Sequence, residues 1–431
     1  MIRNHEPRRL RVVVVGQGYV GLPLAVRAAE VGHDVVGLDV DAGRIKRLMV
    51  GESYVEDVSD RRLAPLLAAG VYRPTVDPSD CDGFDVAVVT VPTPLRDGAP
   101  NLSHVKDAAR TLGRHLTRGA TVVLESTTYP GTTEEVFRPL LERGSGLTAG
   151  RDFHLGYSPE RVDPGNPSWR LENTPKIVSG ITPSSLESVR DFYASLVDTV
   201  VPVASCKEAE LTKLLENTFR HVNIALANEL AIFAHDLGID VWAAIDAAST
   251  KPFGFMRFAP GPGVGGHCLP VDPSYLSWRV ERTLGQNFRF VELANDVNNH
   301  MPDYVVRRLV AGLNERGKPL KGSRILLLGL AYKANTGDAR KTPAARIAEL
   351  LTSMGAEVQA ADPHVLDDAH PRAAGLEGLQ RVEVTPDLLA TTDAVVLLAD
   401  HDAFDYPLIS AHSPYILDCR RRLTGAHVDS L

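Results

Sequence analysis

The chain has 431 residues, 44% of them hydrophobic and 23% charged, which is typical of a soluble globular protein. This length is too great for a single hydrophobic core, so two or three domains are expected. The net charge of −8 argues against nucleic acid as a main partner, because binding to phosphates requires a basic surface.

Membrane and export signals are missing from the sequence pattern. No apolar run is long enough to span a bilayer, and no signal peptide precedes the first expected strand. The four cysteines, Cys81, Cys206, Cys268 and Cys419, are far apart and form no CxxC motif. Such cysteines are typical of free thiols in a reducing compartment. We therefore expect a cytoplasmic protein with no membrane partner.

The first motif is a glycine-rich turn between an expected strand and an expected helix. Residues 11–16 read RVVVVG, as in a buried parallel strand, and a G-x-G-x-x-G motif follows. Gly16 permits a tight turn, Gly18 lets the backbone approach a pyrophosphate, and Gly21 allows a helix to pack closely. Asp39 ends the next strand, where it would bind a ribose 2′-hydroxyl and repel a 2′-phosphate. The pattern therefore predicts NAD rather than NADP as the cofactor.

Three more strand patterns follow, each ending in a polar segment rich in turn residues: 85–94, 120–133 and 152–166. In an open α/β sheet, the loops at the carboxyl ends of the strands form the ligand crevice. We therefore expect Thr93, Thr127 and Glu160 to lie near one another and near the cofactor. Helical patterns alternate with the strands, so this doubly wound domain is expected to reach residue 203.

The stretch from Ser205 to Gly238 predicts one long helix. Ser205 and Glu208 have the spacing of a capping box, and Gly238 suits the left-handed residue that ends a helix. Lys213 and Asn217, four residues apart, would project from one face. Apolar residues recur at spacings of three and four: Leu211, Leu214, Leu215, Phe219, Val222, Leu226, Leu230 and Phe233. They cover more of the helix than one Rossmann face could bury, which predicts a homodimer through the middle domain.

A glycine-dense loop precedes the third cysteine. Residues 261–266 read GPGVGG, which excludes a regular element, and Cys268 and Asp272 follow. Such a loop brings backbone close to a ligand, beside a thiol that could be reactive. The alternatives are an inert buried thiol, or a metal site of His267, Cys268 and Asp272. We expect no metal, because no other cluster supplies the remaining ligands.

A second strand–turn–helix–strand unit begins at Arg324, after an expected linker at residues 318–323. Its turn, Gly329–Lys333, lacks the triple glycine, so a second dinucleotide is not expected, although Lys333 could contact a nucleotide. The predicted fold is α/β, with two Rossmann-like doubly wound domains joined by a middle helical domain that contains one long central helix. The predicted bounds are 1–203 for the NAD-binding domain, 204–317 for the helical domain and 318–431 for the second Rossmann-like domain.

The chain resembles the nucleotide-sugar 6-dehydrogenases, which include UDP-glucose and UDP-N-acetylhexosamine dehydrogenases. The motifs that carry the resemblance extend over nearly the whole length: GQGYVGLPLA, VTVPTP, LESTTYPGTT, YSPERVDPGN, AELTKLLENTFR, GPGVGGHCLPVD, GLAYKANTGDAR and LDCRR. The resemblance implies oxidation of a sugar C6 alcohol to a carboxylate, with two NAD consumed. Cys268 would attack the intermediate aldehyde to form a thiohemiacetal, which is oxidised to a thioester and hydrolysed.

The resemblance also implies roles for other residues. The further catalytic residues are Lys213 and Asn217, which stabilise oxyanions, Asp272 and Thr127, which hold a water or accept the alcohol proton, and Glu160, the base in thioester hydrolysis. The cofactor contacts are Gly16, Gly18, Tyr19, Val20, Gly21, Asp39, Arg44, Thr93, Thr127 and Arg340. The substrate contacts are Glu160, Arg161, Lys213, Asn217, Arg257, Phe258, Gly265, Tyr332 and Lys333.

Several positions depart from the family's patterns. Glucose-type members tend to read KST and NPEFLxEG where this chain has Glu125-Ser-Thr127 and residues 158–165, so a UDP-N-acetylhexosamine is the expected substrate. The N-acetylhexosamine branch often has proline where this chain has Arg257, which could bind the nucleotide-sugar or be a plain surface residue. The sequence therefore leaves open which sugar the substrate carries and whether its nucleotide is UDP or TDP.

Three alternatives remain from the sequence. One is a UDP- or TDP-glucose 6-dehydrogenase. Another is a two-electron NAD-dependent hydroxyacid or sugar-phosphate dehydrogenase, which also carries a lysine and an asparagine on the long helix but needs no thiol. A third is an NAD-responsive binding protein that has kept the fold. Cys268 in its glycine loop argues against the second, and the complete set of catalytic residue types argues against the third.

Overall fold

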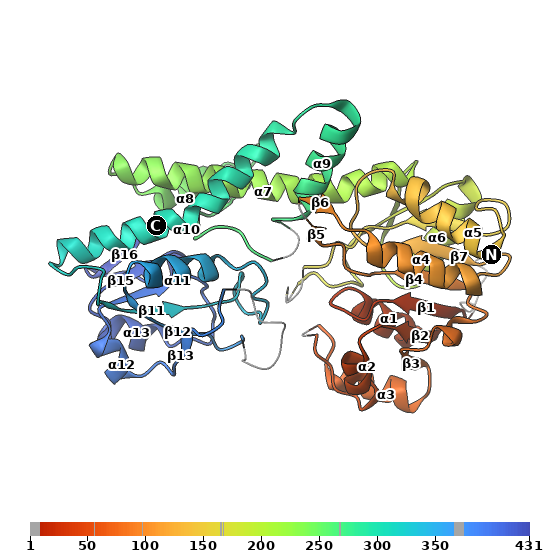
Figure 1. Ribbon diagram of the computed structural model, residues 1–431, viewed down its shortest axis with the longest axis horizontal. Coiled ribbons are helices and arrows are strands. Elements are labelled where there is room, and N and C mark those ends of the chain that lie inside the picture. The colour runs from red at the N-terminus through yellow and green to blue at the C-terminus, as the bar shows by residue number, and fades with distance from the viewer. Residues whose placement is uncertain are drawn as a thin grey trace. The chain divides into compact units, whose positions relative to one another are not determined.

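The computed structural model describes residues 9–55, 57–96, 98–163, 166, 168–266, 269–365 and 375–431. The chain forms two compact units (Figure 1). Unit 1 extends to Glu216 and includes Trp278–Leu284, and unit 2 comprises Asn217–Ser277 and Gly285–Leu431. The helices α7 (Cys206–Asp236) and α9 (Asp272–Leu284) contribute to both units.

Unit 1 is built around an eight-stranded sheet with the order β10-β9-β8-β7-β4-β1-β2-β3. Its strands are β1 (Arg11–Val15), β2 (Asp34–Leu38), β3 (Tyr72–Thr75), β4 (Val86–Val89), β7 (Thr121–Leu124), β8 (His154–Tyr157), β9 (Lys176–Gly180) and β10 (Val200–Pro202). The strands from β3 to β8 are parallel, with Val12 opposite Val35 and Val86. β9 pairs antiparallel with β8, and β10 lies parallel to β9, so the sheet is mixed at this edge.

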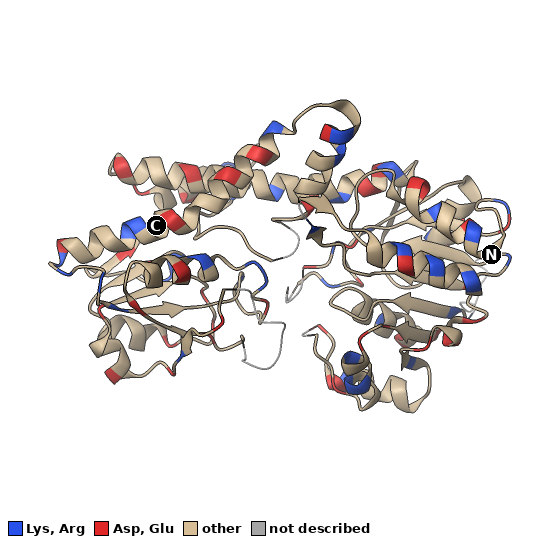
Figure 2. Ribbon diagram, viewed as in Figure 1, with Lys and Arg blue, Asp and Glu red and all other residues tan. Residues whose placement is uncertain are grey.

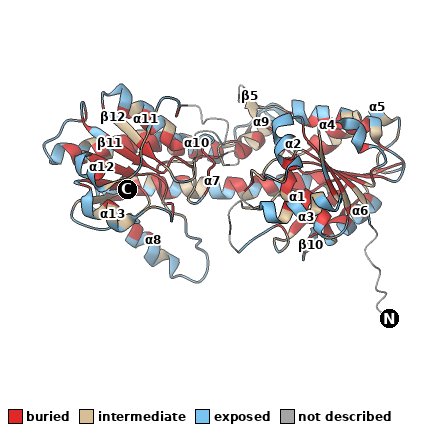
Figure 3. Cartoon of the chain, turned by 90° about the horizontal axis from the view of Figure 1, so that it is seen from below, coloured by how far each residue is buried: buried red, intermediate tan, exposed pale blue. Residues whose placement is uncertain are grey.

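Helices cover the faces of this sheet, with their buried sides inward (Figure 3). They are α1 (Gly21–Glu30), α2 (Ala42–Met49), α3 (Asp60–Ala68), α4 (Ser103–His115), α5 (Arg138–Ser145) and α6 (Pro183–Ala194), with short turns at Pro78–Cys81 and Thr133–Phe137. A two-stranded hairpin, β5 (Leu95–Arg96) and β6 (Ala99–Pro100), follows β4. The valine-rich strands are almost fully buried because helices cover both faces, as expected of a parallel sheet.

Unit 2 holds an entirely parallel six-stranded sheet with the order β13-β12-β11-β14-β15-β16. Its strands are β11 (Arg324–Leu328), β12 (Glu357–Ala361), β13 (Gln380–Arg381), β14 (Ala394–Leu397), β15 (Ile416–Asp418) and β16 (Val428–Ser430). Its helices are α8 (Val241–Ser249), α10 (Arg289–Glu315), α11 (Pro343–Ser353), α12 (Pro386–Thr391) and α13 (Tyr406–His412). Charged residues lie mainly on the helices and loops, and the sheets are largely free of them (Figure 2).

The long helix α7 has the ends that the sequence predicts. The Ser205 hydroxyl accepts a hydrogen bond from the Glu208 N–H at 3.2 Å, and the Glu208 carboxylate accepts one from the Ser205 N–H at 3.1 Å. This reciprocal pair is the capping box. Gly238 has φ +69°, a left-handed conformation that ends the helix at little cost for glycine. Both predicted ends are confirmed.

The predicted fold class is confirmed: two Rossmann-like sheets and a helical region with one long helix. The bounds 203 and 317 stay predictions. Sequence patterns missed α9, because Pro273 and the glycine loop before it resemble a long turn, yet proline suits the first turn of a helix. Among the described residues, no helix combines the length and apolar character needed to cross a bilayer.

Candidate active site

The glycine-rich turn after β1 has the shape of a phosphate-binding loop. Gly16 has φ +95°, and a Cβ on Gly21 would lie 1.8 Å from the Gly16 carbonyl oxygen, so neither position tolerates a side chain. A Cβ on Gly18 would meet nothing within 4 Å, which leaves its backbone open to a ligand. The Thr90 hydroxyl, which sequence reasoning missed, donates to the Gly16 carbonyl at 2.9 Å. Tyr19 and Val20 lie half-buried at the start of α1.

Asp39 lies at the carboxyl end of β2, beside this turn. Its carboxylate accepts hydrogen bonds from the N–H groups of Gln17 at 2.7 Å and Asp41 at 2.9 Å. The Arg44 guanidinium lies 3.6 Å away and is 44% exposed, so it remains accessible to a ligand. The turn, the open backbone at Gly18 and the carboxylate fit the pyrophosphate and adenosine ribose of NAD.

Thr93 and Thr127 lie together, as the sheet topology predicted. The Thr93 hydroxyl donates to the Thr127 carbonyl at 2.8 Å, which ties the loops after β4 and β7. The neighbouring Ser126 hydroxyl donates to the Val91 carbonyl at 2.8 Å. Thr127 itself is partly exposed, so its side chain can reach a ligand at this edge of the sheet.

Glu160 belongs to a buried charged network that sequence reasoning missed. Lys176 at the start of β9 lies 3.5 Å from the Glu160 carboxylate and donates a short hydrogen bond to Glu125. The Tyr193 hydroxyl of α6 donates to the other Glu125 oxygen at 2.5 Å. Glu160 also accepts from the N–H groups of Arg161, at 2.7 Å, and Val162. Glu125 and Lys176 are at most 2% exposed.

The network sets opposite ionisation preferences for its two carboxyl groups. Burial is the largest influence and acts to raise the pKa of Glu160, but the charge of Lys176 and a hydrogen bond with Glu125, together with two weaker causes, outweigh it, so that the pKa falls to about 2. The hydrogen bond from Val162 and the charge of Lys213 add to this fall. Burial raises the pKa of Glu125 to about 7, with Lys176 opposing the rise and Glu160 adding to it. Glu160 is therefore the ionised carboxylate of the pair near neutral pH.

Lys213 lies on α7, 8% exposed, within electrostatic reach of Glu160. One turn earlier, the buried carboxylate of Glu210 accepts hydrogen bonds from the N–H groups of Gly131, at 2.5 Å, and Thr133, at 2.8 Å. Sequence reasoning missed Glu210, which anchors the loop after β7 to α7. The Arg161 guanidinium pairs with Glu216 at 2.7 Å and donates to a carbonyl of the same unit, so it has structural contacts of its own.

Asn217 and Asp272 form a hydrogen-bonded pair in unit 2. The Asn217 amide donates to the Asp272 carboxylate at 2.6 Å, and both residues are at most 3% exposed. Asp272 is the first residue of α9. Lys213 and Asn217 are one turn apart on α7, the spacing from which the sequence predicted a common face.

The glycine loop is held tightly by its surroundings in unit 2. The Gly261 N–H donates to the buried Asn228 side chain at 2.9 Å, and the Gly266 N–H donates to the Arg340 carbonyl at 2.8 Å. A Cβ on Gly265 would lie 2.6 Å from the Tyr332 Cβ, so only glycine fits there. His267 and Cys268 lie outside the described residues.

The remaining predicted contacts of unit 2 have varied surroundings. Arg257 pairs with Asp246 at 2.9 Å on an exposed surface, the arrangement expected of a plain surface arginine. Phe258 packs edge to face on Phe219, with ring centroids 5.6 Å apart. Arg340 is exposed and pairs with Asp338. Tyr332 and Lys333 lie half-buried in the turn after β11.

Asp362 ends β12 at the place that corresponds to Asp39 in unit 1. Its buried carboxylate accepts from the N–H groups of Leu330 and Ala331, and His401 Nε2 lies 3.0 Å from it. These contacts, with the hydrogen bonds from His364 and Val365, lower the exposure of its carboxylate to zero. An acid so enclosed cannot bind a ribose, in contrast to Asp39.

The thiols of the described cysteines are unsuited to nucleophilic attack. Cys81, Cys206 and Cys419 are buried, and burial raises the pKa of each to about 12. A thiol must ionise to attack an electrophile. Cys268 is therefore the remaining candidate nucleophile among the four cysteines of the sequence. Among the residues that the structure describes, no group of three or more possible ligands could hold a metal ion.

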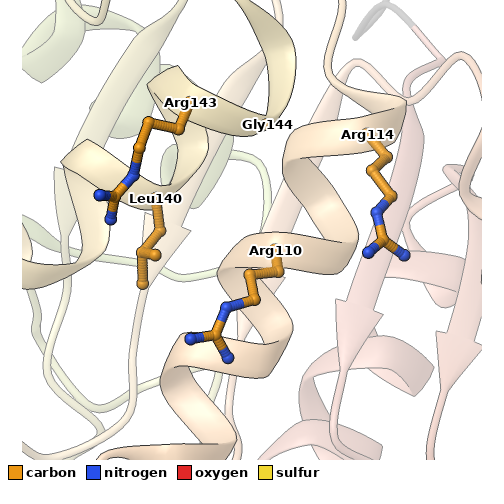
Figure 4. Close-up of a pocket in the computed structure, with 5 residues that line it drawn as sticks. All are labelled: Arg110, Arg114, Leu140, Arg143 and Gly144. Atoms are coloured by element: carbon orange, nitrogen blue, oxygen red, sulfur yellow. The ribbon is translucent and has the colours of Figure 1, made fainter.

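A depression of about 480 Å³ lies between α4 and α5, lined by Arg110, Arg114, Leu140, Arg143 and Gly144 (Figure 4). Its residues belong to the last turns of α4 and to α5. Because these helices run opposite to the parallel strands, their C-terminal ends lie at the amino edge of the sheet. The cofactor loop lies at the carboxyl edge, so this depression is not part of the candidate site.

Comparison with known proteins finds similarity over nearly the whole length of the chain. Three family models of the UDP-glucose/GDP-mannose dehydrogenase family match: the NAD binding domain over residues 10–197, the central domain over 207–300 and the UDP binding domain over 326–425. The chain is 37% identical to the UDP-N-acetyl-D-mannosamine dehydrogenase of Pyrococcus horikoshii, over 92% of this chain and 90% of that protein.

Two further similarities agree with this result. The UDP-N-acetyl-D-glucosamine 6-dehydrogenase of Pseudomonas aeruginosa is 40% identical over 83% of each chain. The solved structure of the UDP-D-ManNAc dehydrogenase from Pyrococcus horikoshii superposes with a TM-score of 0.87 at 34% identity, over 98% of this chain and 99% of that one.

Proposed function

The chain belongs to the UDP-glucose/GDP-mannose dehydrogenase family, and from this premise we propose that it oxidises the C6 alcohol of a UDP-N-acetylhexosamine to the uronate with two NAD. It is an NAD-dependent nucleotide-sugar dehydrogenase. The observation that carries the four-electron reaction is the ionised carboxylate of Glu160, whose side chain is 12% exposed and lies within electrostatic reach of Lys213. A two-electron dehydrogenase needs no such base, because it hydrolyses no acyl intermediate.

The first oxidation removes a proton and a hydride from the alcohol. NAD, when held by the glycine-rich turn after β1 and by Asp39, would supply the hydride acceptor. We assign the proton to Thr127 and Asp272, directly or through a water, and the stabilisation of the developing alkoxide to Lys213 and Asn217. The hydrogen bond from Asn217 to Asp272 fixes both side chains for these roles.

The second oxidation requires a covalent intermediate. The Cys268 thiolate attacks the aldehyde carbon, and the oxyanion takes a proton to give a thiohemiacetal, which again carries a C–H and an O–H. Loss of a hydride to a second NAD and of a proton gives a thioester. Glu160 then takes a proton from water, whose oxygen attacks the thioester carbonyl and releases the uronate and the thiolate.

The nucleotide-sugar specificity is assigned to unit 2, whose sheet matches the family's UDP binding domain. Tyr332 and Lys333 are the proposed contacts in this unit. Relatives named for UDP-N-acetylmannosamine and UDP-N-acetylglucosamine support an N-acetylhexosamine substrate. A cytoplasmic location is proposed with this function, since NAD and UDP-sugars are cytoplasmic metabolites.

A panel of nucleotide sugars tests this proposal. UDP-N-acetylmannosamine, UDP-N-acetylglucosamine, UDP-N-acetylgalactosamine, UDP-glucose and TDP-glucose are each incubated with the enzyme and NAD, and NADH absorbance is followed. We expect the highest kcat/KM with one of the UDP-N-acetylhexosamines. A higher kcat/KM with either glucose substrate would contradict the substrate assignment. No NADH formation with any of the five nucleotide sugars would contradict the proposed activity.

Cofactor selectivity supplies the first prediction. Asp39→Ala should narrow the preference for NAD over NADP, because it removes the carboxylate that binds the 2′-hydroxyl and repels a 2′-phosphate. We expect kcat/KM with NAD to fall roughly 10-fold or more, since a hydrogen bond to a charged group contributes about 1.5–3 kcal/mol. The ratio of kcat/KM for the two cofactors is the measurement. If the wild-type enzyme had equal kcat/KM values for NAD and NADP, the proposal that Asp39 binds the ribose would be wrong.

We also propose a homodimer through the helical region of unit 2. Leu226, Leu230 and Phe233 lie on α7, Leu237 follows its last residue, and the four side chains are 47–73% exposed. Leu230 occurs four residues after Leu226 and Phe233 three residues after Leu230, so these helical residues form an exposed apolar stripe. Exposed apolar stripes of this kind are typical of subunit interfaces.

Light scattering at micromolar concentration tests the dimer. Wild type should have twice the mass of one chain, and Leu226→Glu/Leu230→Glu should shift the mass toward that of one chain because burying two carboxylates at an interface is costly. Leu284→Glu, at an exposed leucine on α9, is the matched control and should stay dimeric. A wild-type monomer would contradict the proposal.

A further inference from the structure

The buried network around Glu160 contains more charged and polar side chains than are needed to place a single catalytic base. Glu125 is 1% exposed, at the end of β7, and it holds Lys176 on one oxygen and the Tyr193 hydroxyl on the other. The Lys176 ammonium also lies 5.2 Å from the centre of the Tyr193 ring, a cation–π distance. Lys176 itself is 2% exposed. Neither Glu125 nor Lys176 is accessible to a substrate, so any influence on the reaction acts through Glu160.

Charge balance fixes how the network is occupied. Glu125 and Glu160 share the ammonium of Lys176 as their ion-pair partner, so two ionised carboxylates would place two negative charges on one directly paired cation. Two carboxyl groups in contact do not both ionise readily, and one holds a proton. Glu160 receives two backbone N–H groups and lies near Lys213, whereas Glu125 is fully enclosed. The proton therefore resides on Glu125 and the negative charge on Glu160.

We propose that Glu125, Lys176 and Tyr193 are positioning residues for the hydrolytic base: Lys176 keeps Glu160 ionised and in place, while Glu125 carries the proton that makes the buried network electrically neutral. The inference deepens the proposed function and rests on it, because it concerns the step in which Glu160 activates water. It also gives a role to the glutamate at the position where glucose-type members tend to have lysine.

Lys176→Met supplies the main test. Without the ammonium, two buried carboxyl groups face each other, and the acid limb of the hydrolysis rate should move to higher pH by roughly one to three units. Hydrolysis is followed through the decay of the acyl-enzyme, using quenched samples and intact-protein mass spectrometry between about pH 3 and pH 8, so that an acid limb raised from the low pKa of Glu160 falls inside the range. The early burst of two NADH should persist, because both hydride transfers precede hydrolysis.

A second substitution separates positioning from simple damage. In Glu125→Gln/Lys176→Met the second buried carboxyl group is also removed, so Glu160 no longer shares its site with another acid and the acid limb should return toward the wild-type pH by about one unit. Damage to packing would not be reversed by a second core substitution. Tyr193→Phe, which keeps the ring beside Lys176, should slow hydrolysis about threefold to tenfold through the lost hydrogen bond to Glu125. Lys207→Met, at an exposed lysine of α7, is the control.

The outcomes distinguish the inference from the function on which it rests. If wild type forms two NADH and a uronate but Lys176→Met keeps the wild-type acid limb, the positioning role is wrong. The same holds if the double variant shows no return. If wild type forms no acyl-enzyme at all, the proposed four-electron function is wrong, whatever the variants do.

Discussion

Cys268→Ala is expected to abolish the steady two-NADH reaction. Its kcat should fall by about a thousandfold or more, a loss similar to that seen when other enzymes lose their catalytic nucleophile. Without the thiol, the aldehyde has no thiohemiacetal from which a second hydride can leave. NAD binding should be unchanged, because the glycine-rich turn and Asp39 belong to unit 1. Wild-type turnover to the uronate by this variant would refute the thioester route.

Cys268→Ser gives a finer result. A serine hydroxyl is a far weaker nucleophile at neutral pH, and an ester hydrolyses more slowly than a thioester. The first hydride transfer needs Thr127, Asp272 and Lys213 rather than the thiol, so the variant should stall after it. We expect at most about one NADH per site in a burst. Rapid-mixing absorbance measures the burst, and Cys81→Ala, which removes one of the buried thiols, should keep full turnover.

Glu160→Gln is expected to stop the cycle one step later. The amide cannot take a proton from water, so steady-state turnover should fall roughly 10²- to 10⁴-fold, the usual contribution of a general base. Both hydride transfers precede hydrolysis, so a burst of about two NADH per site should remain while the acyl-enzyme accumulates.

The same rapid-mixing and mass measurements follow this variant. Glu187→Gln, an exposed glutamate on α6, is its matched control and should behave as wild type. Unchanged turnover by Glu160→Gln would remove Glu160 as the base. A burst of only one NADH would place its role before the second oxidation instead.

Local chemistry made much of the fold predictable. The capping box at Ser205 and the left-handed Gly238 depend on residues a few positions apart, so their patterns are visible in the sequence. The meeting of Thr93 and Thr127 followed from one rule of sheet topology, because parallel strands end at a common edge.

Long-range pairing was not predictable in this way. Lys176 reaches Glu125 because β9 reverses direction beside β8, and no local pattern encodes which strand will be antiparallel. The sequence showed that Glu125 stands where glucose-type members tend to have lysine. It did not show that Lys176, 51 residues later, pairs with Glu125. Arg257 shows the same limit, since the sequence left a surface role and a substrate contact equally open and contained no sign of its pairing with Asp246.

The stoichiometry of the reaction tests the central claim most directly. A limiting amount of the best UDP-N-acetylhexosamine is converted to completion in excess NAD, with NADH measured by absorbance and the sugar product by mass spectrometry. The account predicts two NADH for each uronate formed. One NADH for each molecule of substrate, with an aldehyde or ketone as the product, would contradict it.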